Sequence, residues 1–85
     1  MTREYSKRVE DALNALTQAG TYKFMVHSSK GDWNHKTKEV LLAELKREVE
    51  ELEEAITTGK GKEAIVSEIG DIANYAAMLL DKEIK

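Results

Sequence analysis

Cysteine and proline are both absent from this 85-residue chain, and aromatic residues make up only 6% of it. Without cysteine, neither a disulfide nor a thiolate metal site can form. The longest apolar run is well short of a bilayer span and contains two acidic residues, so a membrane-spanning helix is not expected. No apolar segment follows the basic start, so a secretory signal is not expected either. We therefore expect a protein of the reducing cytoplasm.

A strong excess of charge of one sign is also lacking. The 13 Lys and Arg residues and 16 Asp and Glu residues give a formal net charge of -3 at pH 7. Nucleic-acid polymers are usually bound by basic domains, so such a polymer is not the expected partner. The length allows a single small domain over residues 1–85. A domain of this size buries a limited share of its surface and often relies on oligomerisation.

Helix-forming residues dominate what is present, chiefly Ala, Leu, Glu and Lys, and they predict an all-α domain. Thr2 is suited to cap a first helix, whose apolar residues recur at intervals of three and four. We expect Gly20 to end that helix. The apolar but poorly periodic residues 21–29 predict a further short helix, and the polar stretch 30–37 predicts a loop.

Two long helices are predicted in the remainder of the chain. Thr37 is suited to cap a helix that runs to about Thr57, with Gly59 at its C-terminal end. The last helix is expected over residues 62–81. Because the linker is so short, the two should form an antiparallel hairpin. The last helix is apolar around most of its circumference, so we expect hairpins to assemble into an oligomeric helical bundle.

Two pairs of acidic residues lie on the apolar sides of these two helices. Glu48 and Glu51 are three residues apart on the first, and Glu68 and Asp71 are three residues apart on the second. Residues three apart are neighbours on a helix. Glu48 lies about as many residues before the hairpin turn as Asp71 lies after it. The same holds for Glu51 and Glu68. An antiparallel hairpin should therefore place the two pairs opposite each other.

Four converging carboxylates in a partly dry space would repel one another, and a buried anion is costly unless it is paired. Protonation with raised pKa values would relieve the repulsion, and so would a bound divalent cation. Oxygen ligands without His or Cys select a hard cation such as Mg²⁺ or Mn²⁺. Glutamate is also common on solvated helix faces, so freely exposed acids are the alternative interpretation.

The stretches EVEELEEAI (48–56) and EIGDIANYAAMLLD (68–81) resemble the MazG-like family of all-α nucleoside triphosphate pyrophosphohydrolases. The signature of that family is E-x-x-E on one helix and E-x-x-D on the next. The sequence KGDW (30–33) is similar to an element of some members, and the resemblance covers about residues 30–82. Many members have two adjacent glutamates at the start of the signature, whereas this chain has Arg47 at the first of those positions.

The resemblance implies Mg²⁺-dependent hydrolysis of an NTP or dNTP between the α- and β-phosphates, in a homodimer or homotetramer. It implies that the four acids hold the metal, and Glu51 is our candidate for polarising the attacking water. Lys30 would contact phosphate or be solvated. Trp33 would stack on the base or close the end of the helical core. Asn74 would bind the sugar or a metal-bound water, or satisfy a backbone group. The alternative to an enzyme is a non-catalytic helical oligomerisation or interaction module.

Overall fold

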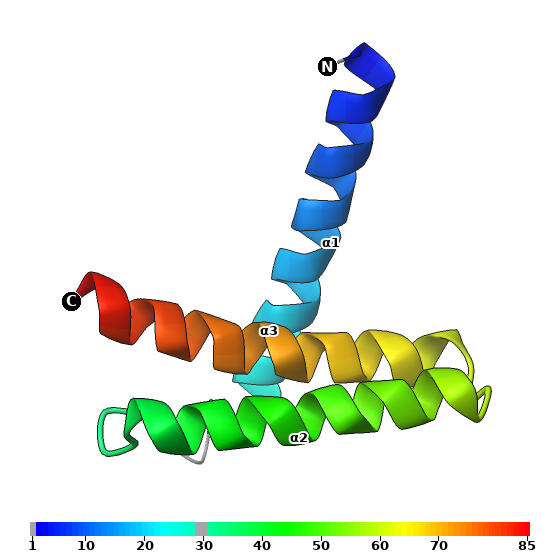
Figure 1. The fold of residues 1–85 in the computed structure, drawn as a ribbon. Helices are drawn as coiled ribbons and strands as arrows, with labels where there is room; N and C mark the ends of the chain where they lie inside the picture. The colour runs from blue at the N-terminus through cyan, green and yellow to red at the C-terminus, as the bar shows by residue number, and fades with distance from the viewer. Residues whose placement is uncertain (1, 29–30) are drawn as a thin grey trace.

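The computed structural model describes residues 2–28 and 31–85, and over these ranges the chain forms helices and connecting turns without any strand. Figure 1 shows three helices, α1 (Arg3–Val26), α2 (Lys38–Thr57) and α3 (Lys62–Ile84). The predicted all-α fold is confirmed. In the described part of the chain, none of the helices has an apolar stretch sufficient to span a membrane.

Threonine side chains begin the first two helices, as their positions in the sequence predict. The Thr2 hydroxyl accepts a hydrogen bond of 3.1 Å from the backbone N–H of Tyr5. The Thr37 hydroxyl accepts one of the same length from the N–H of Val40. Each bond satisfies a donor that has no partner within the helix, and such caps contribute about 1 kcal/mol.

The turn between α2 and α3 depends on glycine. Gly59 has a φ of +67°, and its N–H donates to the carbonyl of Ile56 over 3.2 Å. The N–H of Lys60 donates to the carbonyl of Ala55 over 2.9 Å. This pair of bonds is the Schellman arrangement that ends many helices. The chain then reverses, and α3 runs antiparallel beside α2 (Figure 1), as predicted for the hairpin.

The prediction that Gly20 ends the first helix is wrong, because α1 continues through it to Val26. Gly20 is buried, and a Cβ atom there would lie 3.2 Å from the Cβ of Ala73 on α3. A Cβ on Gly70 would lie 2.9 Å from the backbone oxygen of Ala19. These two glycines therefore serve the close crossing of α1 over α3, and neither ends a helix.

The separate short helix expected over residues 21–29 is instead the last part of α1, up to Val26. Ser29 and Lys30 lie outside the described residues, so the predicted contact of Lys30 with phosphate stays a prediction. The polar residues 31–37 form turns and bends between α1 and α2, as expected for a loop.

Little apolar surface is buried within one chain. Among the described residues, the buried hydrophobic side chains are Leu41 and Ala55, at 0% and 1% exposure. Helix α3 packs against both other helices, and the N-terminal part of α1 extends away from the hairpin (Figure 1). Large hydrophobic side chains are exposed on all three helices. The single chain thus leaves apolar faces of its helices uncovered.

Candidate metal centre

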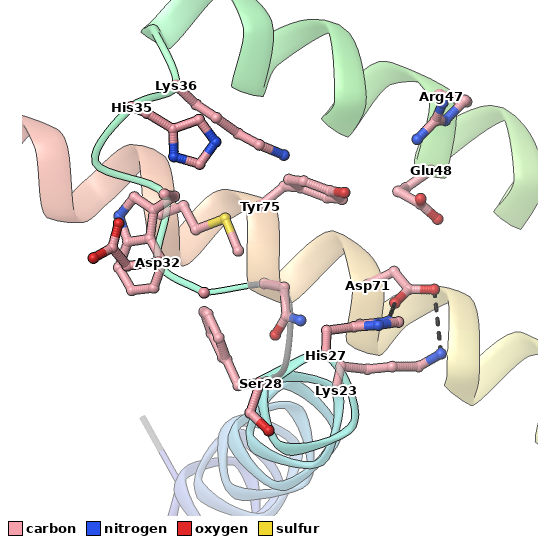
Figure 2. Close-up of a pocket in the computed structure, with 15 residues that line it drawn as sticks. Lys23, His27, Ser28, Asp32, His35, Lys36, Arg47, Glu48, Asp71 and Tyr75 are labelled. Atoms are coloured by element: carbon pink, nitrogen blue, oxygen red, sulfur yellow. Dashed lines mark hydrogen bonds and ion pairs between the residues drawn. The ribbon is translucent and has the colours of Figure 1, made fainter.

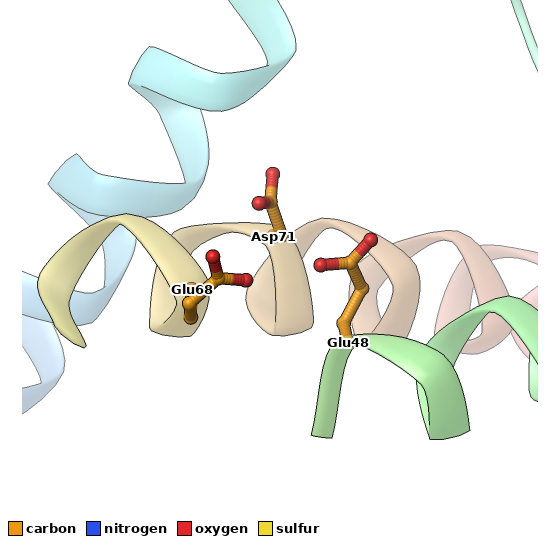
Figure 3. A group of neighbouring side chains, drawn as sticks. All are labelled: Glu48, Glu68 and Asp71. Atoms are coloured by element: carbon orange, nitrogen blue, oxygen red, sulfur yellow. The ribbon is translucent and has the colours of Figure 1, made fainter. Parts of the chain in front are cut away.

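Three of the four predicted acids meet between α2 and α3. Glu48 comes from α2, and Glu68 and Asp71 come from successive turns of α3 (Figure 3). Each offers a carboxylate oxygen, and these oxygens all lie within 4.8 Å of one another. The antiparallel hairpin brings them together because they lie at matching distances from the turn. We call these three side chains the acidic cluster.

Glu51 adjoins the acidic cluster without being one of its three converging members. Its side chain is exposed to solvent, whereas Glu48 is only 8% exposed. Its charge and its hydrogen-bonding capacity nevertheless contribute to the raised pKa values of Glu48 and Glu68. Glu51 is thus a neighbouring carboxylate at the solvent side of the cluster.

Burial and nearby negative charge make Glu48 and Glu68 difficult to ionise. Burial is the largest cause that raises the pKa of Glu48 to about 7, followed by hydrogen bonding with Glu51 and the charge of Asp71. Burial likewise raises the pKa of Glu68, together with Glu51 and Asp71. Loss of hydration disfavours the charged form of a carboxyl group, and nearby negative charge disfavours it further.

The acidic cluster has the properties of a site for a hard divalent cation. Oε2 of Glu48 and Oε2 of Glu68 are both buried and have no hydrogen-bond partner among the described residues. Buried carboxylate oxygens are normally paired, because leaving them unpaired costs free energy. A cation such as Mg²⁺ or Mn²⁺ takes oxygen ligands and would supply the missing partner. These residues therefore fit the predicted metal.

Helix α1 brings two basic side chains to the same place, and the sequence did not predict them. The Nζ atom of Lys23 lies 3.3 Å from Oδ2 of Asp71, and Nε2 of His27 lies 3.9 Å from Oδ1 (Figure 2). Both follow from the continuation of α1 beyond Gly20. Lys23 and His27 lie three and seven residues after that glycine, which places all three on one helical face. This spacing is the feature of the sequence that could have indicated the two basic side chains.

A pocket of about 720 Å³ opens beside the acidic cluster (Figure 2). Its walls come from all three helices and from the loop before α2. Asp32, Glu48 and Asp71 are its acidic residues, and five basic side chains also line it. These are Lys23, His27, His35, Lys36 and Arg47. A space lined by both carboxylates and cations suits a ligand that carries phosphates together with a metal ion.

Two aromatic residues that line this pocket, Phe24 and Trp33, pack against each other. The ring centroids of Phe24 and Trp33 are 5.6 Å apart, and the rings are tilted by 48°. The indole Nε1 of Trp33 donates a hydrogen bond of 3.2 Å to Oδ2 of Asp81. Trp33 therefore closes one end of the helical packing and also lines the pocket, so both of its predicted roles are compatible with its position.

Asn74 is buried at 4% exposure and also lines the pocket. Its Oδ1 atom has no hydrogen-bond partner among the described residues. The expectation that Asn74 satisfies a backbone group is therefore not met through this oxygen. This oxygen is buried beside α1, 3.9 Å from where a Cβ atom on Gly20 would lie.

Lys36, which lines the pocket, forms a second ion pair with Glu44. The ammonium of Lys36 lies 2.9 and 3.0 Å from the two carboxylate oxygens of Glu44. Burial and the charge of Glu44 raise the pKa of the Tyr75 hydroxyl. Lys36 forms an ion pair with Glu44, and Lys23 forms one with Asp71. Arg47 is the positively charged side chain of the pocket lining that remains exposed to solvent.

Comparisons with protein-family models, with curated proteins and with solved structures found no match for the chain. The function is therefore inferred from the residues themselves and from their geometry. The acidic cluster, its unpaired buried oxygens and the adjoining pocket with basic walls are the features that carry it.

Proposed function

We propose that the protein is a Mg²⁺-dependent nucleoside triphosphate pyrophosphohydrolase that converts an NTP or dNTP to the monophosphate and pyrophosphate. The observation that carries this proposal is the convergence of Glu48, Glu68 and Asp71, with oxygens within 4.8 Å of one another. The resemblance of the E-x-x-E and E-x-x-D segments to MazG-like enzymes supplies the reaction.

In the proposed reaction, a water oxygen bonds to a phosphorus of the α–β anhydride. The bond from that phosphorus to the bridging oxygen breaks, and the bridging oxygen keeps the electron pair and departs with the other product, so that the monophosphate and pyrophosphate separate. A divalent ion held by the acidic cluster would neutralise phosphate oxygens and polarise the water. Glu51 adjoins the cluster and is open to solvent, so we assign it the proton that the water loses.

The basic side chains of the pocket are proposed to hold the phosphates. Arg47 is the main candidate, because it faces the pocket beside Glu48 and its guanidinium matches the geometry of phosphate oxygens. Trp33 and Asn74 line the same pocket, where they are proposed to contact the base and the sugar. The proposed active unit is a homo-oligomer, because one chain leaves apolar faces of its helices exposed.

The proposal is tested with a panel of NTPs and dNTPs in the presence of Mg²⁺, with pyrophosphate as the measured product. Release of pyrophosphate is expected for at least one nucleotide and should be lost in Glu68→Gln. Arg47→Ala should raise KM more than it lowers kcat, if the guanidinium binds phosphate equally in ground and transition states. If none of the nucleotides releases pyrophosphate, the hypothesis that the protein is a pyrophosphohydrolase is overturned.

The exposed apolar side chains favour one second candidate, a non-catalytic helical oligomerisation module. Fourteen large hydrophobic side chains are exposed in the described part of the chain, which is typical of a surface that binds another protein. A protein that oligomerises but neither responds to Mg²⁺ nor releases pyrophosphate would support this candidate.

A further inference from the structure

Trp33 is the one tryptophan of the chain, and it lines the pocket from the loop between α1 and α2. The same loop brings Asp32, His35 and Lys36 to the pocket (Figure 2). Two hydrogen bonds within the loop fix its course. The N–H of Asn34 donates to Oδ1 of Asp32 over 3.0 Å, and the N–H of Lys36 donates to the carbonyl of Trp33 over 3.0 Å. The backbone at Trp33 is therefore held in a turn.

The indole ring of Trp33 is held by two of the helices as well. Phe24 of α1 packs against it, with the ring centroids 5.6 Å apart. Asp81, in the last turn of α3, accepts a hydrogen bond of 3.2 Å from the indole Nε1. The other oxygen of Asp81 lies 2.8 Å from the ammonium of Lys85, which lowers the pKa of the Asp81 carboxyl. Asp81 is thus ionised at neutral pH, and a charged acceptor forms the stronger hydrogen bond.

The bond to Asp81 determines which part of Trp33 a ligand can contact. An indole has a single polar hydrogen, on Nε1, and no acceptor. Because Asp81 accepts that hydrogen, Trp33 offers the pocket only the apolar surface of its ring. Such a surface binds a flat ring by stacking, which is open to every nucleobase because each has a π-face.

We propose that Asp81 is a positioning residue for the nucleobase, which holds the Trp33 ring so that a base stacks on it and receives no hydrogen bond from it. This inference rests on the proposed function, because it requires a nucleotide in the pocket. Asp81 is not one of the described residues that line the pocket, so it acts through Trp33. The pocket should consequently accept, at Trp33, bases that differ in their hydrogen-bonding groups.

Nucleotides that cannot be cleaved test this positioning role without any turnover. The α,β-methylene analogues of ATP and CTP carry carbon in place of the α–β bridging oxygen, so the proposed reaction cannot split them. Inorganic triphosphate is the reference ligand, because it has the phosphates and no base. Isothermal titration calorimetry with Mg²⁺ measures the three dissociation constants, and quenching of the Trp33 emission reports a base stacked on the indole.

Asp81→Leu removes the acceptor and should raise the dissociation constants of both analogues by about 5-fold or more, as expected when a stacking contact is lost. The dissociation constant of inorganic triphosphate should not change. Asp81→Asn keeps an acceptor oxygen and should restore most of the affinity. Lys85→Met is the matched control, since it removes the other partner of Asp81 and leaves the bond to Trp33 in place. Circular dichroism confirms that each variant is helical.

The proposal is overturned if Asp81→Leu weakens triphosphate as much as the nucleotides, or if it lowers the melting temperature and changes no dissociation constant. Asp81 would then have a structural role only. A loss confined to one of the two bases would also overturn it, because Trp33 would then recognise a polar group of that base. A parent chain that binds neither analogue would overturn it as well.

Failure of the proposed reaction gives a different result. A chain that binds both analogues and loses them in Asp81→Leu, but releases no pyrophosphate from any NTP or dNTP, would retain the positioning role in a nucleotide-binding site without hydrolysis. Conversely, pyrophosphate release together with unchanged binding in Asp81→Leu would leave the reaction standing and overturn the role of Asp81.

Discussion

The ammonium nitrogen of Lys23 lies 3.3 Å from Oδ2 of Asp71, although 48 positions separate the two residues. Their side chains are only 15% and 18% exposed, so water screens the pair weakly. A cation from α1 thus offsets part of the negative charge that α2 and α3 bring together. The contact links the docking of α1 to the electrostatics of the candidate metal centre.

Replacing Lys23 by methionine should destabilise the metal-free protein by about 1–3 kcal/mol, because Asp71 loses a charged hydrogen-bond partner. Mg²⁺ should then raise the melting temperature more in Lys23→Met than in the parent chain, since no ammonium competes for Asp71. Differential scanning fluorimetry with and without Mg²⁺ measures both effects. Lys7→Met is the matched control, because Lys7 forms an exposed pair with Asp11. An equal or smaller response to Mg²⁺ in Lys23→Met would contradict the competition.

Substitution of Glu68 by glutamine should have opposite effects with and without metal. Without metal, the neutral amide removes one charge from the buried group of acids, so the melting temperature should rise. With Mg²⁺, the stabilisation should be lost, because a ligand of the native state raises stability only where it binds. Glu50→Gln, on the exposed surface of α2, should change neither value. Retained stabilisation by Mg²⁺ in Glu68→Gln would exclude this residue as a ligand.

The stability of the metal-free protein should fall as pH rises through about 7. The pKa of Glu48 is raised from its ordinary value of 4.5 to about 7 in the folded chain, so the folded state binds this proton more tightly than the unfolded state. Its contribution is complete below pH 4.5 and is lost as pH increases through the folded pKa. Thermal unfolding in a chelating buffer measures the slope, which Glu48→Gln should flatten.

Binding of Mg²⁺ should show the reverse dependence on pH. The cation requires deprotonated carboxylates, so its affinity should increase with pH and level off above about 7, where Glu48 is ionised. Isothermal titration calorimetry across this range measures the dependence, together with the protons released on binding. An affinity that does not change with pH would mean that the ion binds away from Glu48.

A methyl group at the crossing of α1 and α3 should reverse the usual effect of replacing glycine in a helix. Gly→Ala within a helix normally stabilises by about 1 kcal/mol. At Gly70 the new Cβ would lie 2.9 Å from both the backbone oxygen of Ala19 and the Cγ of Lys23, so Gly70→Ala should destabilise. At Gly20 the new Cβ would meet the Cβ of Ala73 at 3.2 Å and Oδ1 of Asn74 at 3.9 Å, so Gly20→Ala should be close to neutral. Urea unfolding ranks the two, and stabilisation by Gly70→Ala would contradict the crossing.

The sequence was sufficient to predict the hairpin and its acids, because both depend on local information. The Thr37 cap, the apolar periodicity and the glycines of the turn determine α2, α3 and their antiparallel order. Given that order, counting residues from the turn is enough to bring Glu48 opposite Glu68 and Asp71. Each step uses residues close together in the chain.

The path of α1 could not be predicted in the same way. A glycine after an amphipathic segment is typical of a helix end, and Gly20 is followed by residues of weak periodicity. What keeps the helix intact is the close approach of Ala73 from α3, a contact between distant parts of the chain. Lys23 and His27 were missed as a consequence, because their place beside Asp71 follows from the crossing.

The tight turn at Gly59 and Gly61 has a consequence for the order of folding. It joins the three acids through a short loop, and closing a short loop costs little chain entropy. The contact of Lys23 with Asp71 closes a much longer one, and contacts of this kind form more slowly. We therefore expect the hairpin to bring its three carboxylates together before α1 packs and Lys23 contacts Asp71. Dissolved divalent ions should then accelerate the early phase of refolding, because they offset the repulsion among these carboxylates.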